Sequence, residues 1–212
     1  YYSQEARMYM PVTLLAMIVA YFVMRRNFLG LTLSSAALLY TDYLPVFLLG
    51  SFVVYFLIYD RKYLKNVVVW IGTTFLFFTP WISTFLNQLK IGSGIKENAP
   101  LWWEILGRTN LKELALVPVK FMIGRISSYD KIFYGASVAV SLVPFLIAFW
   151  KSAQDIRKTR LLWFWFLGPL TLAAIFGAVF SGFSYFRLLF ILPAFYLLIA
   201  YGATQLKNAK IR

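Results

Sequence analysis

The sequence predicts an all-α integral membrane protein with about seven transmembrane helices and amphipathic interfacial helices in one long outer loop. Of its 212 residues, 61% are hydrophobic, 14% are charged and 20% are Phe, Trp or Tyr. A soluble domain of this size cannot bury that much apolar surface, so the bilayer must be its solvent. The lysines and arginines stand in short runs between apolar stretches, as they do in the loops of membrane proteins.

Seven apolar stretches supply the predicted spans, and most approach the roughly 20 residues that a helix needs to cross about 30 Å of hydrocarbon. They are 8–24, 28–41, 43–59, 67–86, 133–150, 161–180 and 186–203. Glycines in the last two stretches predict close helix packing, at Gly168, Gly177 and Gly182.

The region 28–59 is too long for one span and short for two, and charge parity decides between them. Two arginines at 25–26 precede it and three basic residues within 61–65 follow it. Both basic groups favour the cytoplasmic side, so an even number of crossings must separate them. Tyr40-Thr41-Asp42-Tyr43, with Pro45 just beyond, is the natural point of reversal.

The alternation of spans then divides the loops between two sides. The outer segments are 1–7, 40–43, 87–132 and 181–185. The inner segments are 25–27, 60–66, 151–160 and 204–212, and they hold twelve of the 21 lysines and arginines. Arg7 and Arg187 are the exceptions, because both lie at outer ends of helices.

The long extracytoplasmic loop 87–132 is amphipathic. Its segment 101–106 places tryptophans beside a glutamate, and Asn110 with Glu113 forms a capping-box pattern for a helix that Pro118 interrupts. We expect these helices to lie flat on the outer interface, anchored by the tryptophans.

Composition also limits chemistry and partners. The net charge of +13 is explained by loops held against anionic lipid headgroups, so we expect no nucleic-acid partner. The sequence contains no cysteine and no histidine, which excludes disulfides, Cys/His zinc sites and imidazole chemistry from this segment. The chain starts at Tyr1 without a signal-peptide pattern, so residues 1–212 are expected to be one polytopic region, a fragment lacking its N-terminal helices.

The first nine residues concentrate polar groups at the outer mouth of the first span. If they are helical, Gln4 and Arg7 share one face, while Glu5 and Tyr9 share the neighbouring face. The planar guanidinium of Arg7 would suit a phosphate at headgroup depth. The alternative is an interfacial arginine that snorkels and pairs with Glu5.

Two segments resemble a known family. Tyr2 to Tyr9 reads Tyr-Ser-Gln-Glu-Ala-Arg-Met-Tyr, and Leu39 to Tyr43 reads Leu-Tyr-Thr-Asp-Tyr at the reversal. Both resemble the middle of bacterial GT-C membrane glycosyltransferases of glycosyltransferase family 39. This group is related to the dolichyl-phosphate-mannose-protein mannosyltransferases and to the enzymes that attach aminoarabinose to lipid A. The family usually has histidine where this chain has Asp42.

The resemblance covers roughly residues 1–90, and the remainder is similar mainly in hydropathy and helix order. Trp81 after Thr79-Pro80, with Gln88 nearby, resembles the family, as does the weaker Tyr185-Phe186-Arg187 pattern before Pro193.

The resemblance implies an enzyme of the bacterial inner membrane whose short basic loops and C-terminus are cytoplasmic. It would move a sugar from a polyprenyl-phosphate donor to an extracytoplasmic lipid, glycan or protein acceptor. The catalytic acid pair would lie in a loop upstream of Tyr1, so no catalytic residue is expected in this chain. A divalent cation would be held by that preceding loop, and no metal by this chain.

The predicted site residues are therefore supporting ones. Arg7, with Gln4 and Tyr2, is expected to contact the donor phosphate or to shape its cavity, and Glu5 to orient Arg7. Arg187 is a second phosphate candidate, with interfacial snorkelling as the alternative.

Three further residues are assigned to the sugar or its cavity, namely Asp42, Tyr43 and Tyr9. Asp42 would accept a hydrogen bond from a sugar hydroxyl, although an aspartate in a tight turn is common for purely local reasons.

Two other classes of protein fit the same pattern. A lipid-linked sugar flippase would also place arginines near phosphate, although the predicted spans carry almost no charge at their centres. A noncatalytic membrane scaffold would leave the outer polar residues scattered. The enzyme hypothesis predicts that Arg7, Asp42 and Arg187 border one outward-opening cavity.

Overall fold

The computed structural model describes residues 8–98, 117–123, 131–177 and 185–209, and all of its regular elements there are helices. The α-helices are α1 (Tyr9–Arg25), α2 (Phe28–Thr41), α3 (Val46–Tyr59), α4 (Leu64–Phe78), α5 (Ile82–Asn98), α8 (Val117–Ile123), α9 (Lys131–Gln154), α10 (Ile156–Gly177) and α11 (Leu192–Ala209). Three short 3-10 helices join or precede them: η1 (Arg61–Tyr63), η2 (Thr79–Trp81) and η3 (Tyr185–Ile191). The predicted all-α class is confirmed.

Several helices are suited to a bilayer. Three are long and apolar enough to cross a membrane: Arg61–Gly92, Ile156–Phe176 and Phe186–Leu206. Four shorter apolar helices accompany them: Tyr9–Arg25, Phe28–Thr41, Val46–Tyr59 and Val138–Gln154. Large aliphatic side chains point outward, for example Leu29, Val68 and Val140, each more than 70% exposed. Such a surface is expected where lipid is the solvent.

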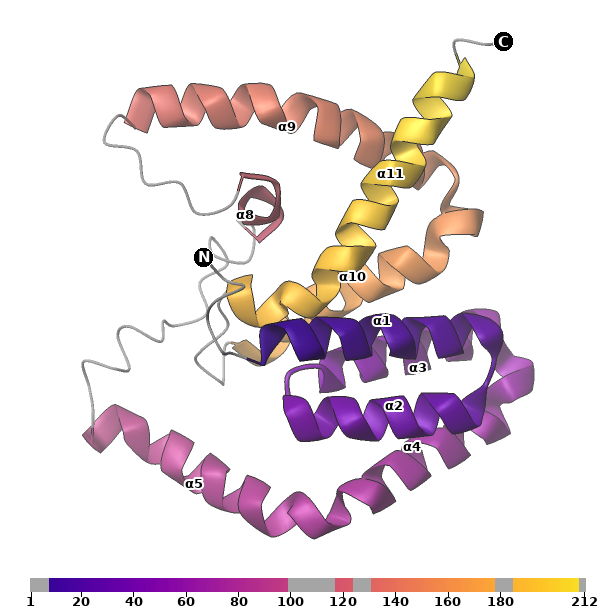
Figure 1. Cartoon of the computed structure of the whole chain (residues 1–212), viewed down its shortest axis with the longest axis vertical. Helices are drawn as coiled ribbons and strands as arrows, with labels where there is room; N and C mark the ends of the chain where they lie inside the picture. The colour runs from indigo at the N-terminus through magenta and orange to yellow at the C-terminus, as the bar shows by residue number, and fades with distance from the viewer. Residues whose placement is uncertain (1–7, 99–116, 124–130, 178–184, 210–212) are drawn as a thin grey trace.

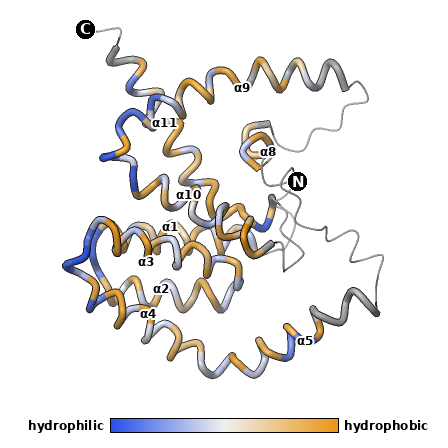
Figure 2. Tube along the Cα trace, turned by 180° about the vertical axis from the view of Figure 1, so that it is seen from behind, coloured by the Kyte–Doolittle hydropathy of each residue, from blue (hydrophilic) through white to orange (hydrophobic). Residues whose placement is uncertain are grey.

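The helix connections divide between two ends of the bundle. In Figure 1 the α1–α2, α3–α4 and α9–α10 connections lie on the right, with the start of α1 and the α2–α3 turn on the left. Figure 2, which shows the molecule from behind, has strongly hydrophilic residues at these three helix connections. We call the end that carries the α1–α2, α3–α4 and α9–α10 connections the basic end. The end that carries the start of α1 and the α2–α3 turn is called the Asp42 end. Three of the four basic segments predicted to share a side, 25–27, 60–66 and 151–160, therefore lie at one end of the structure.

Two helix boundaries differ from the hydropathy pattern. The stretch predicted at 67–86 belongs to a helix that bends through η2 and continues as α5 to Asn98, forming a V in Figure 1. The basic segment 151–160 is almost entirely helical, with one turn residue at Asp155. Hydropathy marks where apolar residues stop, whereas Lys and Arg continue a helix without penalty.

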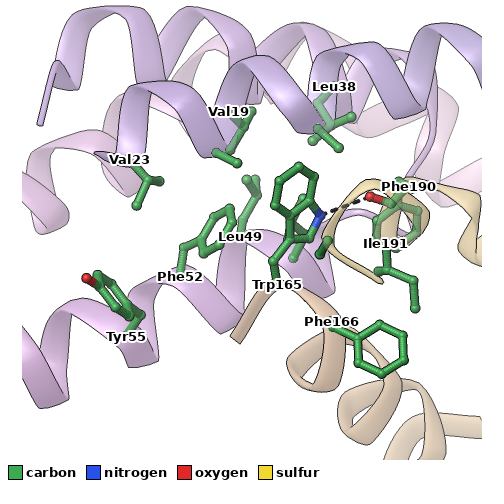
Figure 3. Packing of buried hydrophobic residues seen from close by; sticks show 14 of the residues in the cluster. Val19, Val23, Leu38, Leu49, Phe52, Tyr55, Trp165, Phe166, Phe190 and Ile191 are labelled. Carbon is green, nitrogen blue, oxygen red and sulfur yellow. Dashed lines mark hydrogen bonds between the residues drawn. The ribbon is translucent and has the colours of Figure 1, made fainter. Parts of the chain in front are cut away.

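The core joins the N-terminal helices to α10 and η3. Trp165 is 4% exposed and lies among Leu49, Phe52 and Phe190, as Figure 3 shows. Its indole Nε1 donates a 2.9 Å hydrogen bond to the Phe190 carbonyl. The polar edge of this buried ring is therefore satisfied, which makes its large apolar area a net stabilising contribution.

Small residues bring helix backbones together, as predicted for Gly168. A Cβ atom there would lie 1.7 Å from Ser51 Oγ, and the Ser51 hydroxyl donates a 2.5 Å hydrogen bond to the Phe164 carbonyl. α3 and α10 thus combine close approach with an interhelical hydrogen bond. Gly177 ends α10, and Gly182 lies outside the described residues. Gly202, not singled out from the sequence, makes the equivalent approach to Ala148.

The part of the long loop that is described is helical at both ends. Residues 87–98 continue α5, and Pro118 lies in the first turn of α8, where proline is tolerated, instead of interrupting a helix. The capping-box residues Asn110 and Glu113 lie outside the described residues. α8 is seen nearly end-on in Figure 1, crosswise to α1. It is held by Phe121, whose carbonyl accepts a 2.8 Å hydrogen bond from the Tyr196 hydroxyl.

An ion pair fastens two turns at the basic end. Arg26 caps α1 with a left-handed backbone (φ 55°), and its guanidinium bonds the Val23 carbonyl and the Asp60 carboxylate. The guanidinium also lies 5.1 Å from the centre of the Phe56 ring. The α1–α2 connection is thereby attached to the end of α3.

Candidate functional site

The reversal at Asp42 has a local explanation. α2 ends at Thr41, and the extended Asp42 accepts a 3.1 Å hydrogen bond on Oδ1 from the Leu44 backbone N–H. This Asx-type turn leads into Pro45, which caps α3. The predicted turn is confirmed, and one oxygen of Asp42 serves the turn itself.

Tyr43 is the centre of a hydrogen-bonded chain that links the turn to the bent helix. Trp81 Nε1 donates to the Tyr43 hydroxyl at 2.7 Å, and that hydroxyl donates to Gln88 Oε1 at 2.8 Å. The Tyr43 ring also packs edge-on against Phe85 at 4.9 Å. The segment around Tyr43 and the segment around Trp81 are therefore in direct contact.

Tyr40 makes a second attachment to the same bend. Its hydroxyl donates a 2.8 Å hydrogen bond to the Phe77 carbonyl, and its ring lies 5.8 Å from that of Trp81. Pro80 has no N–H and sits in a 3-10 turn, so backbone carbonyls just before it need other donors. Tyr40 supplies one of them.

The start of α1 and η3 lie beside each other at the same end. The rings of Tyr9 and Phe186 meet edge-on at 5.7 Å, and η3 packs along α1. Arg187 follows Phe186 directly and is partly buried, close enough to Asp42 for its charge to act on that carboxyl group. Within the described part of the chain, Arg187 has no hydrogen bond or ion pair.

The structure thus brings together all four predicted site residues that it describes. They come from three separate segments: Tyr9 from the start of α1, Asp42 and Tyr43 from the α2–α3 turn, and Arg187 from η3. Tyr9 contacts Phe186 next to Arg187, and the charge of Arg187 acts on Asp42. The other four, Arg7, Gln4, Tyr2 and Glu5, lie outside the described residues.

Trp81 and Gln88 were noted in the sequence only for their resemblance and not assigned to the site. The signal that places them there is their spacing. Trp81, Phe85 and Gln88 stand at i, i+4 and i+7, which puts them on one helix face. That face is the one that meets Tyr43.

The ionisation of Asp42 reflects its position. Burial raises the pKa of Asp42 above its ordinary value. Three weaker effects lower this pKa: the hydrogen bond from the Leu44 backbone N–H, the charge of Arg187 and the hydrogen bond from the Tyr43 backbone N–H. Since burial dominates, the carboxylate is less well solvated than a surface aspartate and a strong acceptor for a bound hydroxyl.

We expect Arg187→Gln to raise the pKa of Asp42 further, because the substitution removes the attraction that favours the charged carboxylate. Infrared titration of ¹³C-labelled aspartate would measure this shift, with Asp42→Asn identifying the band. Arg25→Gln, at the basic end, is the matched control and should leave the band unmoved. An unchanged Asp42 band in Arg187→Gln would show that the two groups are not neighbours.

The side chains at this site are suited to binding a ligand and less suited to general acid–base catalysis. It combines a guanidinium, a carboxylate, two tyrosine hydroxyls and an amide, the set that binds phosphate and sugar hydroxyls. No group of three or more acidic side chains able to hold a metal lies within the described ranges.

Comparison of the chain with models of known families, with curated proteins and with solved structures returned no match.

Proposed function

We propose that this chain forms the donor-side helices of a membrane glycosyltransferase of the GT-C type. The enzyme would move a sugar from a polyprenyl-phosphate donor to a lipid, glycan or protein acceptor at the Asp42 end. The observation that supports it most is the convergence of Tyr9, the adjacent pair Asp42 and Tyr43, and Arg187, three segments that are far apart in the sequence. A scaffold would not require polar groups from three segments to converge.

The membrane arrangement is part of the same proposal. Seven crossings, made by the three long and four shorter apolar helices, put the basic end in the cytoplasm and the Asp42 end outside. The crosswise α8 would then lie along the outer interface. The short α2 and α3 place their turn below the headgroups, where irregular backbone is tolerated because Tyr43, Trp81 and Gln88 surround it.

Each residue has a role in this proposal. Arg187 provides the charge for a donor phosphate at headgroup depth, since the guanidinium binds phosphate oxygens in pairs. Asp42 accepts from a sugar hydroxyl with the oxygen that the turn leaves available. Tyr43 holds the turn against α5 and fixes the position of Asp42. Proton removal from the acceptor stays with carboxylates expected upstream of Tyr1.

We expect Arg187→Ala to lower sugar transfer about tenfold, the loss typical of one charged hydrogen bond to phosphate. Transfer from a radiolabelled polyprenyl-phosphate sugar would be measured in membranes that contain the full-length protein at equal abundance. Arg25→Ala removes an exposed arginine from the basic end and should transfer at the wild-type rate.

The outcomes separate the hypotheses. Undiminished transfer by Arg187→Ala would reduce this residue to an interfacial anchor. If the wild type transfers sugar from no polyprenyl donor but moves lipid-linked sugar between leaflets, the protein is a flippase. Absence of both activities would leave the scaffold.

A further inference from the structure

An apolar groove runs along α10 from the basic end. Its volume is about 480 Å³, and its lining includes Ala153, Ile156, Trp163, Phe164, Leu167 and Thr171. Within the helix these residues follow spacings of three and four and so share one face. From Ile156 to Thr171 the helix rises roughly 22 Å, more than the ~15 Å depth of one leaflet's hydrocarbon.

Two of the side chains that line the groove, Thr171 and Trp163, carry a polar atom. The hydroxyl of Thr171 already donates a 2.8 Å hydrogen bond to the Gly168 carbonyl of its own helix. The other lining side chains are hydrocarbon or aromatic, and the indole Nε1 of Trp163 is a buried donor with no hydrogen-bond partner among the described residues. The volume lies within the ~300–1,000 Å³ of ordinary ligand pockets. Because the lining is almost wholly apolar, an alkyl chain is the ligand chemistry that fits the groove.

A single arginine occupies the basic end of the same face. Arg160 stands four residues after Ile156 and three and four before Trp163 and Phe164. Its guanidinium lies 4.7 Å from the centre of the Tyr59 ring, and Tyr59 in turn packs edge-on against Phe164 at 5.9 Å. This aromatic contact holds a cation beside a residue that lines the groove.

Among the residues that the structure describes, Arg160 has no acidic partner. The nearby Asp155 is engaged by Lys158 at 2.9 Å and by the Tyr201 hydroxyl at 2.5 Å. Within the described part of the chain, no ion pair involves Arg160. Arg157 and Lys158 are exposed and add to the positive potential around the same turn.

We propose that this groove and Arg160 form a binding site for one anionic glycerophospholipid. One acyl chain would lie along α10 over Leu167 and Trp163, and the phosphate would meet the Arg160 guanidinium at the α9–α10 turn. The site is separate from the Asp42 end and is independent of the proposed transfer reaction. It would fasten α10 and α3 to one leaflet through a specific lipid.

Native mass spectrometry of the full-length protein, titrated in detergent with phosphatidylglycerol or phosphatidylcholine, would test the site without any sugar donor. The wild type should retain one phosphatidylglycerol in preference to phosphatidylcholine. Arg160→Gln should weaken phosphatidylglycerol binding about tenfold and remove the preference. Leu167→Trp, at a residue 43% exposed, should fill the groove and weaken binding of both lipids.

Arg25→Gln is the matched control, because Arg25 also lies at the basic end over a tyrosine ring, at 5.9 Å from Tyr21, but away from the groove. It should bind phosphatidylglycerol as the wild type does. Equal losses in Arg25→Gln and Arg160→Gln would mean diffuse charge attraction and overturn the site, as would unchanged binding by Arg160→Gln. Displacement of phosphatidylglycerol by equimolar polyprenyl phosphate would overturn the assignment to a glycerophospholipid.

Discussion

Gly202→Ala is expected to lower the free energy of unfolding by about 3 kcal/mol, at the upper end of the usual cost of overpacking. A Cβ atom at residue 202 would lie 1.8 Å from the Ala148 carbonyl oxygen. The obstacle is backbone, so no side-chain rotation relieves it. α9 and α11 would have to move apart, which loosens the contact between Phe145 and Phe195, whose rings stack 6.5 Å apart.

The measurement is an unfolding titration in mixed micelles, with Gly72→Ala as the control. Gly72 also lies within a long apolar helix, but a Cβ atom there meets nothing within 4 Å. Alanine should therefore be neutral or stabilising by up to about 1 kcal/mol at residue 72. Similar losses in both variants would show that α9 and α11 do not approach as closely as the structure has them.

Asp60→Ala is expected to cost about 2 kcal/mol, less than the roughly 3–5 kcal/mol for breaking a fully buried pair. The reduction follows from partial solvation, since the side chains of Arg26 and Asp60 are 24% and 14% exposed. Without the carboxylate, the Arg26 guanidinium would stay among the rings of Tyr55, Phe56 and Tyr63 with its charge uncompensated.

A double-mutant cycle would measure this pair. Arg26→Ala combined with Asp60→Ala should be less destabilising than the sum of the single changes, because the second change removes the unpaired charge. Lys158→Gln removes one partner of a solvated ion pair and should change stability little. Strict additivity in the cycle would contradict the contact between Arg26 and Asp60.

Most of the fold could be predicted from hydropathy and charge. Each of the seven apolar stretches is mainly helical where the structure describes it, and the reversal at Tyr40–Tyr43 is where parity required it. The limits of the helices were less predictable. α5 continues past the apolar stretch because hydropathy measures the solvent that a residue prefers and not the length of the hydrogen-bonded backbone.

The candidate site was predictable where it depends on local sequence and not where it depends on how distant helices pack. The turn chemistry of Asp42 is a local property of the sequence. The chain of hydrogen bonds from Trp81 through Tyr43 to Gln88 depends on the bend at Thr79–Trp81, which brings a distant helix face to the turn. The close approach at Gly202 likewise depends on which helix lies opposite, and no pattern within α11 reveals it.

The bend at Pro80 has a mechanical consequence. Beyond it, Phe85 and Gln88 connect α5 to Tyr43, while Leu86, Leu89 and Ile91 face outward. α5 can therefore act as a lever that turns about the bend at Pro80 and is attached to the α2–α3 turn through the Tyr43 hydroxyl. Any tilt of the lever, whether from membrane thickness or from a load on its far end, would be transmitted as a pull on the turn that carries Asp42.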